Sequence, residues 1–166
     1  MPYTLKTISA EGIAEAKSKA ELYRLLNEPE EAESICYDVL AVDPEDQQAL
    51  RLLGLAITDQ FKGDLSDRYA EVESVFGRLR DPYERLYYRG ILSERRAKAQ
   101  LNAGRPPYGL LTVLEEALRC YEEAERIRPR GNDDAILRWN RCVRLIQGRP
   151  ESDWHPKSEL VDIGGA

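Results

Sequence analysis

Proline and glycine divide this chain of 166 residues into seven segments of helical length, and that division constrains its fold most. Between the breaks, apolar residues recur every three or four positions, the spacing of an amphipathic helix. Few β-branched runs are present, so strands are poorly supported. The expected helices span about residues 9–26, 30–42, 46–61, 66–79, 83–101, 108–127 and 133–146. The pattern predicts an all-α fold with short turns, either a bundle or a solenoid.

A repeated spacing decides between these two architectures. An alanine lies twelve residues before a proline three times, at Ala32 and Pro44, Ala70 and Pro82, and Ala117 and Pro129. Residues at i+4 and i+7 from each alanine share its helix face and are mostly small, which lets a neighbouring helix approach closely. The repetition favours a solenoid, and we expect all three alanines to be buried at helix crossings.

The first helix of each pair carries a second small-residue position. Gly54 costs roughly 1 kcal/mol relative to alanine inside a helix, a cost that makes sense where another helix crosses. Ala20 occupies this position in the first pair, and either Gly90 or Leu92 does so in the third.

Together with Tyr23 and Leu53, these residues resemble the tetratricopeptide family, whose unit is a helix–turn–helix of about 34 residues. The resemblance implies a right-handed α-α superhelix with repeats at about 11–44, 45–82 and 83–129 and a capping helix at 132–147, between an extension at 1–10 and a tail at 148–166. The prolines lie 38 and 47 residues apart, so we expect an irregular superhelix with a protruding third hairpin. We expect little regular structure in the tail.

In this family the first helices line a concave groove that holds an extended or helical segment of a partner protein, and the resemblance implies the same role here. It places these residues in the groove: Lys17, Glu21, Arg24, Gln48, Arg51, Leu55, Asp59, Tyr87, Tyr88, Ile91, Glu94, Asn140 and Arg144. In the capping helix we expect Ile136, Trp139, Val143 and Ile146 to face inward, with Arg138, Arg141 and Arg144 outside or at the end of the groove.

We expect the partner to contact Arg51, Leu55, Tyr87 and Tyr88 most directly, because aromatic residues with arginine are typical of binding hot spots. The alternative is that the two tyrosines belong to the core. The subgroup that grips the C-terminal carboxylate of heat-shock chaperones is rejected, because Glu21 and Leu52 stand where it has asparagine.

Chemistry-bearing patterns are sparse. His155 is the only histidine, and no metal-ligand cluster or glycine-rich phosphate loop is visible. We therefore expect no catalytic residue, metal or cofactor, and we interpret Cys36 and Cys142 as packing residues. A secretion-type chaperone that holds a client is one alternative. An enzyme or a nucleic-acid binder on a helical scaffold is an alternative of another class.

The net charge of −6 argues against general nucleic-acid affinity. Residues 1–83 hold 9 Lys/Arg and 17 Asp/Glu, net −8, whereas residues 84–166 hold 15 and 13, net +2. This asymmetry fits a protein partner or a polar head-to-tail contact, which leaves a homodimer as one alternative, and it also fits a plain solvated surface. Isolated cysteines and the absence of an apolar leader or membrane span predict a cytoplasmic protein.

Overall fold

The computed structural model describes residues 2–157, and within that range every regular element is a helix. The α-helices are α1 (Ile13–Leu25), α2 (Pro29–Val42), α3 (Gln47–Thr58), α4 (Tyr69–Gly77), α5 (Pro82–Asn102), α6 (Leu111–Arg126), α7 (Asp134–Gln147) and α8 (Glu151–Trp154). Short 3-10 turns at Ala10–Gly12 and Pro107–Gly109 precede α1 and α6. The all-α prediction is confirmed.

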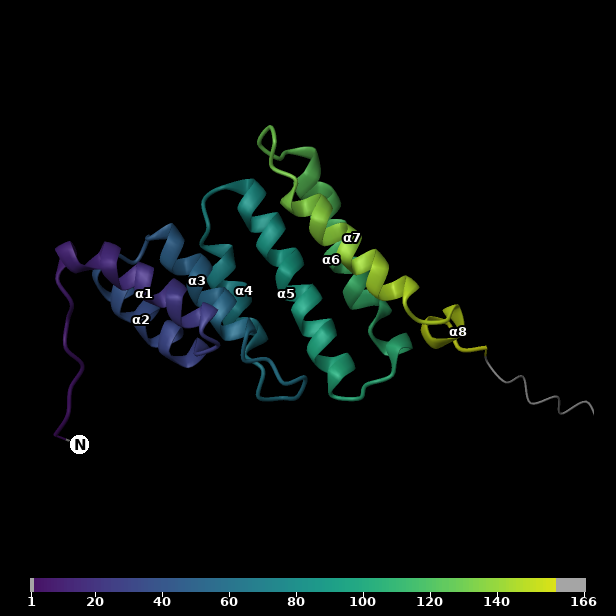
Figure 1. The fold of residues 1–166 in the computed structure, drawn as a ribbon, viewed down its shortest axis with the longest axis horizontal. Coiled ribbons are helices and arrows are strands. Elements are labelled where there is room, and N and C mark those ends of the chain that lie inside the picture. Colours follow the sequence, from purple (N-terminus) through teal and green to yellow (C-terminus); the bar gives the residue numbers. More distant parts are fainter. Residues whose placement is uncertain (1, 158–166) are drawn as a thin grey trace, which may run out of the picture.

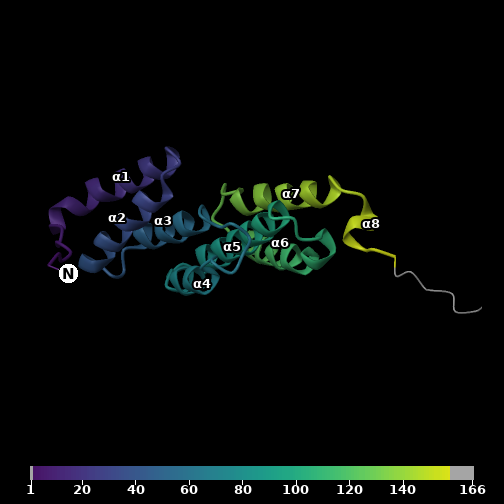
Figure 2. The same ribbon diagram turned by 90° about the horizontal axis from the view of Figure 1, so that it is seen from below.

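Helices pack mainly against their neighbours in the sequence, from α1 on α2 through to α6 on α7 (Figure 1). Figure 2 shows α1 and α7 on one side of the molecule and α4 and α6 on the other. This order is the one expected for stacked helical hairpins, and the right-handed superhelix stays a prediction. Among the described helices, none combines the length and the apolar character needed to cross a bilayer.

Side-chain caps explain where several helices begin. Ser9 accepts a hydrogen bond from the Gly12 amide (3.1 Å), which starts the first 3-10 turn. Asp46 caps α3 in the same way, because its Oδ1 accepts from the Ala49 amide at 2.9 Å. Four of the seven expected helices, α1, α3, α4 and α6, are shorter than the apolar pattern suggested.

Small residues lie where the two helices of a hairpin cross most closely. A Cβ atom added to Gly54 of α3 would lie 2.1 Å from Cε1 of Phe76 in α4. A Cβ atom added to Gly90 of α5 would lie 2.5 Å from Cε1 of Tyr121 in α6. Each glycine thus makes room for an aromatic ring of its hairpin partner. Gly90, rather than Leu92, is the small residue of the third hairpin.

The buried-alanine prediction is right for two hairpins and wrong for one. Ala32 and Ala117 are fully buried, but Ala70 is exposed. In α4 the buried face begins at Val72 and continues through Phe76 to Leu79, two residues out of the expected register. The reason is the role of the proline: Pro44 follows the end of α2, whereas Pro82 is the first residue of α5. Proline suits that position because its missing N–H is not needed there.

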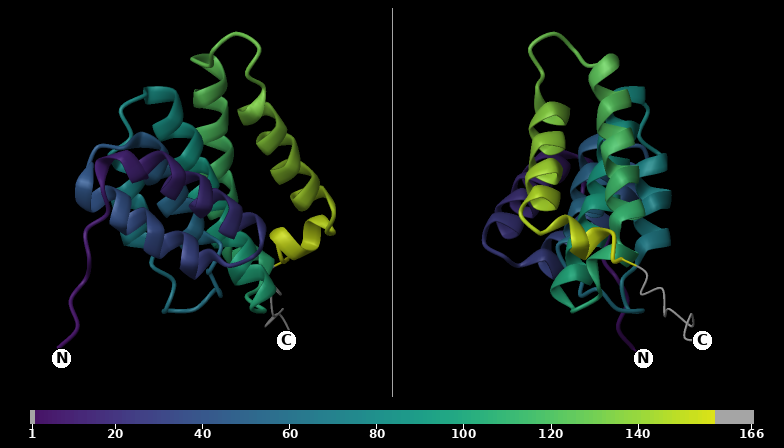
Figure 3. Two further views of the ribbon diagram at one scale, coloured as in Figure 1. Left: turned by 60° about the vertical axis from the view of Figure 1, so that its left-hand side comes forward. Right: turned by 90° about the vertical axis from the view of Figure 1, so that its right-hand side faces the viewer.

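Part of the C-terminal tail is helical, contrary to expectation. Trp154, in α8, is buried among side chains that include Ala97 and Leu114, and its indole Nε1 donates to the Ile146 carbonyl at 2.8 Å. Figure 3 shows α8 folded under the end of the α6–α7 hairpin that lies opposite the connecting loop. The rest of the tail prediction, from residue 158 on, lies outside the described residues.

Candidate functional site

The surface formed by α1, α3, α5 and α7, here called the odd-helix face, is joined by ion pairs between successive hairpins. Lys17 of α1 contacts Asp46 at the start of α3 (2.9 Å), and Arg51 of α3 contacts Glu84 of α5 (2.9 Å). The paired residues on this face are 29 to 36 residues apart, about the length of one hairpin unit. These contacts fix the spacing of the helices that form the face.

The solvent-accessible residues of α3 lie on the odd-helix face. Eight of its twelve residues are buried. Gln48, Arg51 and Leu55 are only half-buried, and their i, i+3 and i+7 spacing places them on one stripe. Apart from Gln47 in the first turn, the residues that α3 leaves accessible are thus the ones that the family resemblance placed in a groove, and Asp59 just after its end is accessible too.

The structure brings most of the other expected groove residues to the same face, where several are already engaged in ion pairs. Lys17, Arg24, Arg51 and Asp59 all form ion pairs. Glu21 and Arg144 are exposed, and Asn140 is half-buried on α7.

Two expected groove residues are misplaced. Ile91 and Glu94 are buried, Glu94 completely, because both face α6 and α7 rather than solvent. Arg138, expected outside, instead reaches inward and contacts Glu94 at 3.3 Å. The buried carboxylate shows that the register implied by the resemblance is wrong at these positions of the third hairpin.

The two tyrosines belong partly to the core. The Tyr87 ring stacks on Tyr83 with centroids 5.9 Å apart and meets Tyr88 edge-on at 5.1 Å. Tyr88 also contacts Phe76 of α4 at 5.2 Å. Both rings are half-buried, and with Leu55 they join the core of the first two hairpins to that of the third. Their main role in the structure is packing.

Cations outnumber carboxylates in two clusters on this face, one around Asp59 at the end of α3 and one around Glu94 of α5. Asp59 accepts from Arg24 (2.7 Å) and from Arg95 (2.6 Å). Glu94 accepts from Lys98 (2.5 Å) and from Arg138 (3.3 Å). Four cations therefore share two carboxylates, an excess of two positive charges on a protein of net charge −6.

The local field is visible in the pKa of Arg95. Burial lowers this pKa, the Asp59 carboxylate opposes the change, and the nearby charges of Arg24 and Arg138 lower it further. Positive charges thus repel one another here, so an added carboxylate would be stabilised on this part of the odd-helix face.

The buried Glu94 is held by a complete set of donors. Besides its two cations, its Oε1 accepts from the Tyr121 hydroxyl (3.0 Å) and the Cys142 thiol (3.2 Å). Burial by itself raises the pKa of Glu94, but hydrogen bonding and charge from Lys98, with smaller contributions from Cys142 and Arg138, outweigh it and hold the pKa below its ordinary value. The carboxylate stays ionised and ties α5 to α6 and α7. The i, i+4 spacing of Glu94 and Lys98 was a usable sequence signal, whereas the partners 27 to 48 residues away were not.

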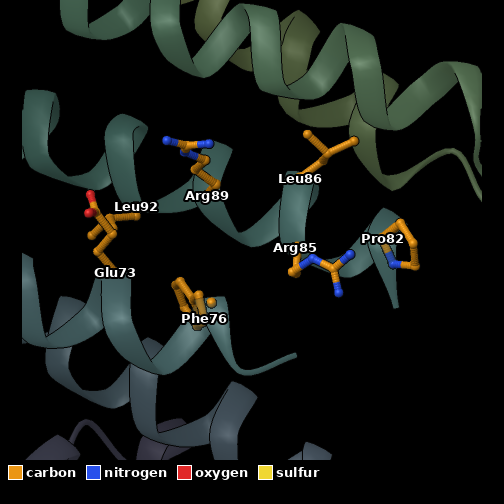
Figure 4. Close-up of a pocket in the computed structure, with 8 residues that line it drawn as sticks. Glu73, Phe76, Pro82, Arg85, Leu86, Arg89 and Leu92 are labelled. Atoms are coloured by element: carbon orange, nitrogen blue, oxygen red, sulfur yellow. The ribbon is translucent and has the colours of Figure 1, made fainter. Parts of the chain in front are cut away.

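A concave feature, here called the α4–α5 cleft, lies away from the expected groove. It has a volume of about 420 Å³ and is lined by Glu73, Phe76, Gly77, Pro82, Arg85, Leu86, Arg89 and Leu92. Figure 4 shows Glu73 and Phe76 of α4 on one side and the side chains of α5 on the other. Arg85 is already committed, because its Nη1 donates to the Leu79 and Arg80 carbonyls at 2.8 Å each. Arg89 is exposed at its rim.

Reactive side chains do not converge in the described residues. Cys36, Cys120 and Cys142 are unpaired and buried, and burial raises the pKa of Cys36 and of Cys142 to about 12, which keeps these thiols protonated. Over residues 2–157 no group of three His, Cys, Asp or Glu side chains is placed to hold a metal ion. His155 is exposed just beyond α8.

Comparisons with protein-family models, with curated proteins and with solved structures find no match to this chain.

Proposed function

We propose that this chain is a protein-interaction module of the tetratricopeptide type, which holds a segment of a partner protein on its odd-helix face and performs no catalysis. The observation that carries the proposal is the open stripe of α3, where Gln48, Arg51 and Leu55 stay accessible on an otherwise buried helix. Helices from successive hairpins extend this stripe into a continuous surface, which suits an extended or helical ligand better than a small molecule.

The chemistry of the face favours an acidic segment. Arg24 and Arg95 share Asp59, and Lys98 and Arg138 share Glu94, so the face carries uncompensated positive charge beside the half-buried Leu55. Because two cations share each of Asp59 and Glu94, a partner carboxylate could accept a charge-assisted hydrogen bond from one of these cations. Its apolar side chains would rest on Leu55 and the exposed edges of Tyr87 and Tyr88. The binding centre thus moves from Arg51 and Tyr88 toward Arg24, Arg95 and Lys98.

A photo-crosslinking experiment tests this assignment without disturbing the ion pairs. A crosslinking amino acid is placed at Glu21 of α1 or at Gln48 of α3, two accessible positions that form no ion pair among residues 2–157. The same residue at Ser74 of α4 or Glu123 of α6 serves as the matched control, because both lie exposed on the opposite helices. The expected result in the native cell is one partner captured from Glu21 and Gln48 but not from the controls.

The captured partner should carry an acidic segment, and crosslinking should weaken as salt rises because the contact is electrostatic. Capture from Ser74 or Glu123 instead would move the site to the even-numbered helices. Capture of many unrelated proteins from all four positions would favour the alternative of a secretion-type chaperone that wraps a client. The buried, protonated cysteines suit a reducing compartment, so we keep the cytoplasm as the proposed location.

A further inference from the structure

The outer side of α1, at one end of the array, is apolar and uncovered. Ala20 points into the protein and is fully buried. On the opposite side of the same helix, Leu22 is 50% exposed and Leu25 is 81% exposed, with Leu26 beside them. Glu15, exposed two turns before Leu22, lies on the same side. Three exposed leucines gathered at the end of α1 mark an interaction surface.

The outer side of α7, at the other end, presents one exposed leucine in its first turn and basic residues further on. Ala135 and Cys142 are the buried residues of this helix. Opposite them, Leu137 is 63% exposed, and Arg141 and Arg144 follow at i+4 and i+7 on the same stripe. Within residues 2–157, neither arginine forms an ion pair, in contrast to Arg138 on the inner side.

The two surfaces complement each other when the helices run antiparallel. Leu22 lies seven residues after Glu15, and Leu137 lies seven residues before Arg144. Seven residues correspond to a rise of about 10.5 Å in either helix. Leucine then lies opposite leucine at one end of the contact, and Glu15 lies opposite Arg144 at the other. The net charge of −8 over residues 1–83 and +2 over residues 84–166 steers the same pairing.

We propose that α1 of one copy of this chain packs antiparallel against α7 of a second copy, so that the protein associates with itself head to tail. One copy cannot satisfy both surfaces, because α1 and α7 lie in opposite halves of the molecule (Figure 1). Both lie on the same side of it (Figure 2), so two copies that face each other can form the contact twice. A contact between unlike surfaces either closes in this way or continues along a chain of copies. The proposal does not rest on the partner proposed for the odd-helix face.

The test uses two variants, each broken at one surface. Leu22→Glu with Leu25→Glu removes the contact surface of α1, and Arg141→Glu with Arg144→Glu removes that of α7. Light scattering and sedimentation equilibrium should show that the wild type assembles as its concentration rises, and less so at high salt. Each variant alone should have its self-association Kd raised at least about tenfold, because like charges then meet or leucines are lost.

Mixing the two variants gives the decisive measurement. The α7-broken copy keeps an intact α1 and the α1-broken copy keeps an intact α7, so the mixture should form a 1:1 complex that neither makes alone. A wild type that stays monomeric, an α7 variant that still assembles alone, or a mixture without the complex would each overturn the proposal. If the leucine variant loses its helical circular dichroism, Glu15→Arg mixed with Arg144→Glu replaces it, and the same 1:1 complex is expected because both α1–α7 contacts between these two copies pair opposite charges.

Discussion

The first two hairpins and the third hairpin with α7 hold their charges in different ways. In α1–α4 the ion pairs and charged hydrogen bonds lie near the surface and join neighbouring hairpins. Arg68 forms an ion pair with Glu33 of α2, and the Tyr37 hydroxyl donates a hydrogen bond to Glu71 of α4 at 2.6 Å. In α5–α7 one carboxylate, Glu94, is 0% exposed and gathers four donors from three helices. The first arrangement is made of separable contacts of small value, whereas the second works only as a complete set.

Removal of the buried Glu94 carboxylate should lower the free energy of unfolding more than any other change considered below. A small loss would contradict the contrast between the two regions. Glu94→Ala leaves Lys98, Arg138 and the Tyr121 hydroxyl without their acceptor. We expect a loss of about 3–5 kcal/mol in the free energy of unfolding, measured by denaturant titration. Glu123→Ala, at an exposed position on α6, is the control and should change stability by less than about 0.5 kcal/mol. Equal effects of the two variants would mean that the network contributes nothing as a unit.

Glycine variants test whether the helices of a hairpin cross equally closely in the two regions. Gly54→Ala and Gly90→Ala place a Cβ atom 2.1 Å from Phe76 and 2.5 Å from Tyr121, so each should cost about 1–3 kcal/mol despite the better helix propensity of alanine. Gly77, at the end of α4, has nothing within 4 Å of an added Cβ. Gly77→Ala should therefore leave the unfolding midpoint unchanged or raise it. If Gly54→Ala also raises the midpoint, the ring of Phe76 moves away freely and the crossing is loose.

The fold was largely predictable from the sequence because its determinants are local. Apolar spacing, the caps at Ser9 and Asp46 and the breaks at proline act within a few residues of the chain. The error at Ala70 has a physical origin: a proline marks a helix end when it follows the helix and a helix start when it occupies the first turn, as Pro82 does. The local pattern did not separate the two, and the register of α4 moved by two residues.

The candidate site was less predictable, because its chemistry depends on contacts between distant residues. Arg51 and Asp59 were placed on the open face by the repeat pattern, but their ionic partners are 33 to 36 residues away and a charge pattern alone does not pair them. The family resemblance placed Glu94 in the expected groove, and because glutamate is usually exposed, nothing in the local sequence marked it as buried. Only the positions of Tyr121, Arg138 and Cys142 show why it is buried.

Acid titration sharpens the comparison through the two carboxylates. A hydrogen bond from Arg68 is the main cause that lowers the pKa of Glu33, and the pKa of Glu94 is lowered against the opposing effect of burial; the ordinary value for both is 4.5. A carboxylate whose pKa is lowered in the folded state stabilises the protein fully above its ordinary pKa of 4.5. This stabilisation is lost as the pH falls from 4.5 through the lower, folded-state pKa. Denaturant titrations between about pH 7 and pH 3 should show a shallower acid-side decline for Glu33→Gln and for Glu94→Gln than for the wild type.

The two variants should differ at neutral pH. Glu94→Gln leaves two cations beside a neutral amide in the protein interior, so its stability at pH 7 should be clearly lower than that of Glu33→Gln. An unchanged acid-side slope in Glu94→Gln would show that this carboxylate is already protonated in the folded protein. The opposite order at neutral pH would reverse the contrast between the two regions.

The smallest expected effect lies at the seam where the two regions meet. Arg51 of α3 pairs with Glu84 of α5, and both side chains keep about a quarter of their surface exposed, 28% and 25%. Water competes for such a pair, and both side chains lose rotamer freedom when it forms, so a double-mutant cycle with Arg51→Ala and Glu84→Ala should give a coupling energy below about 1 kcal/mol. The coupling should shrink further in high salt, because the pair is partly solvated. Tyr88→Ala, one turn along α5, is the matched comparison: it removes the ring that contacts Phe76 and should lower the melting temperature far more. If the coupling energy of the ion pair instead equals the stability lost in Tyr88→Ala, charge rather than packing holds α3 to α5. The ion pair would then not be a separable contact of small value, and the contrast between the two regions would not apply where they meet.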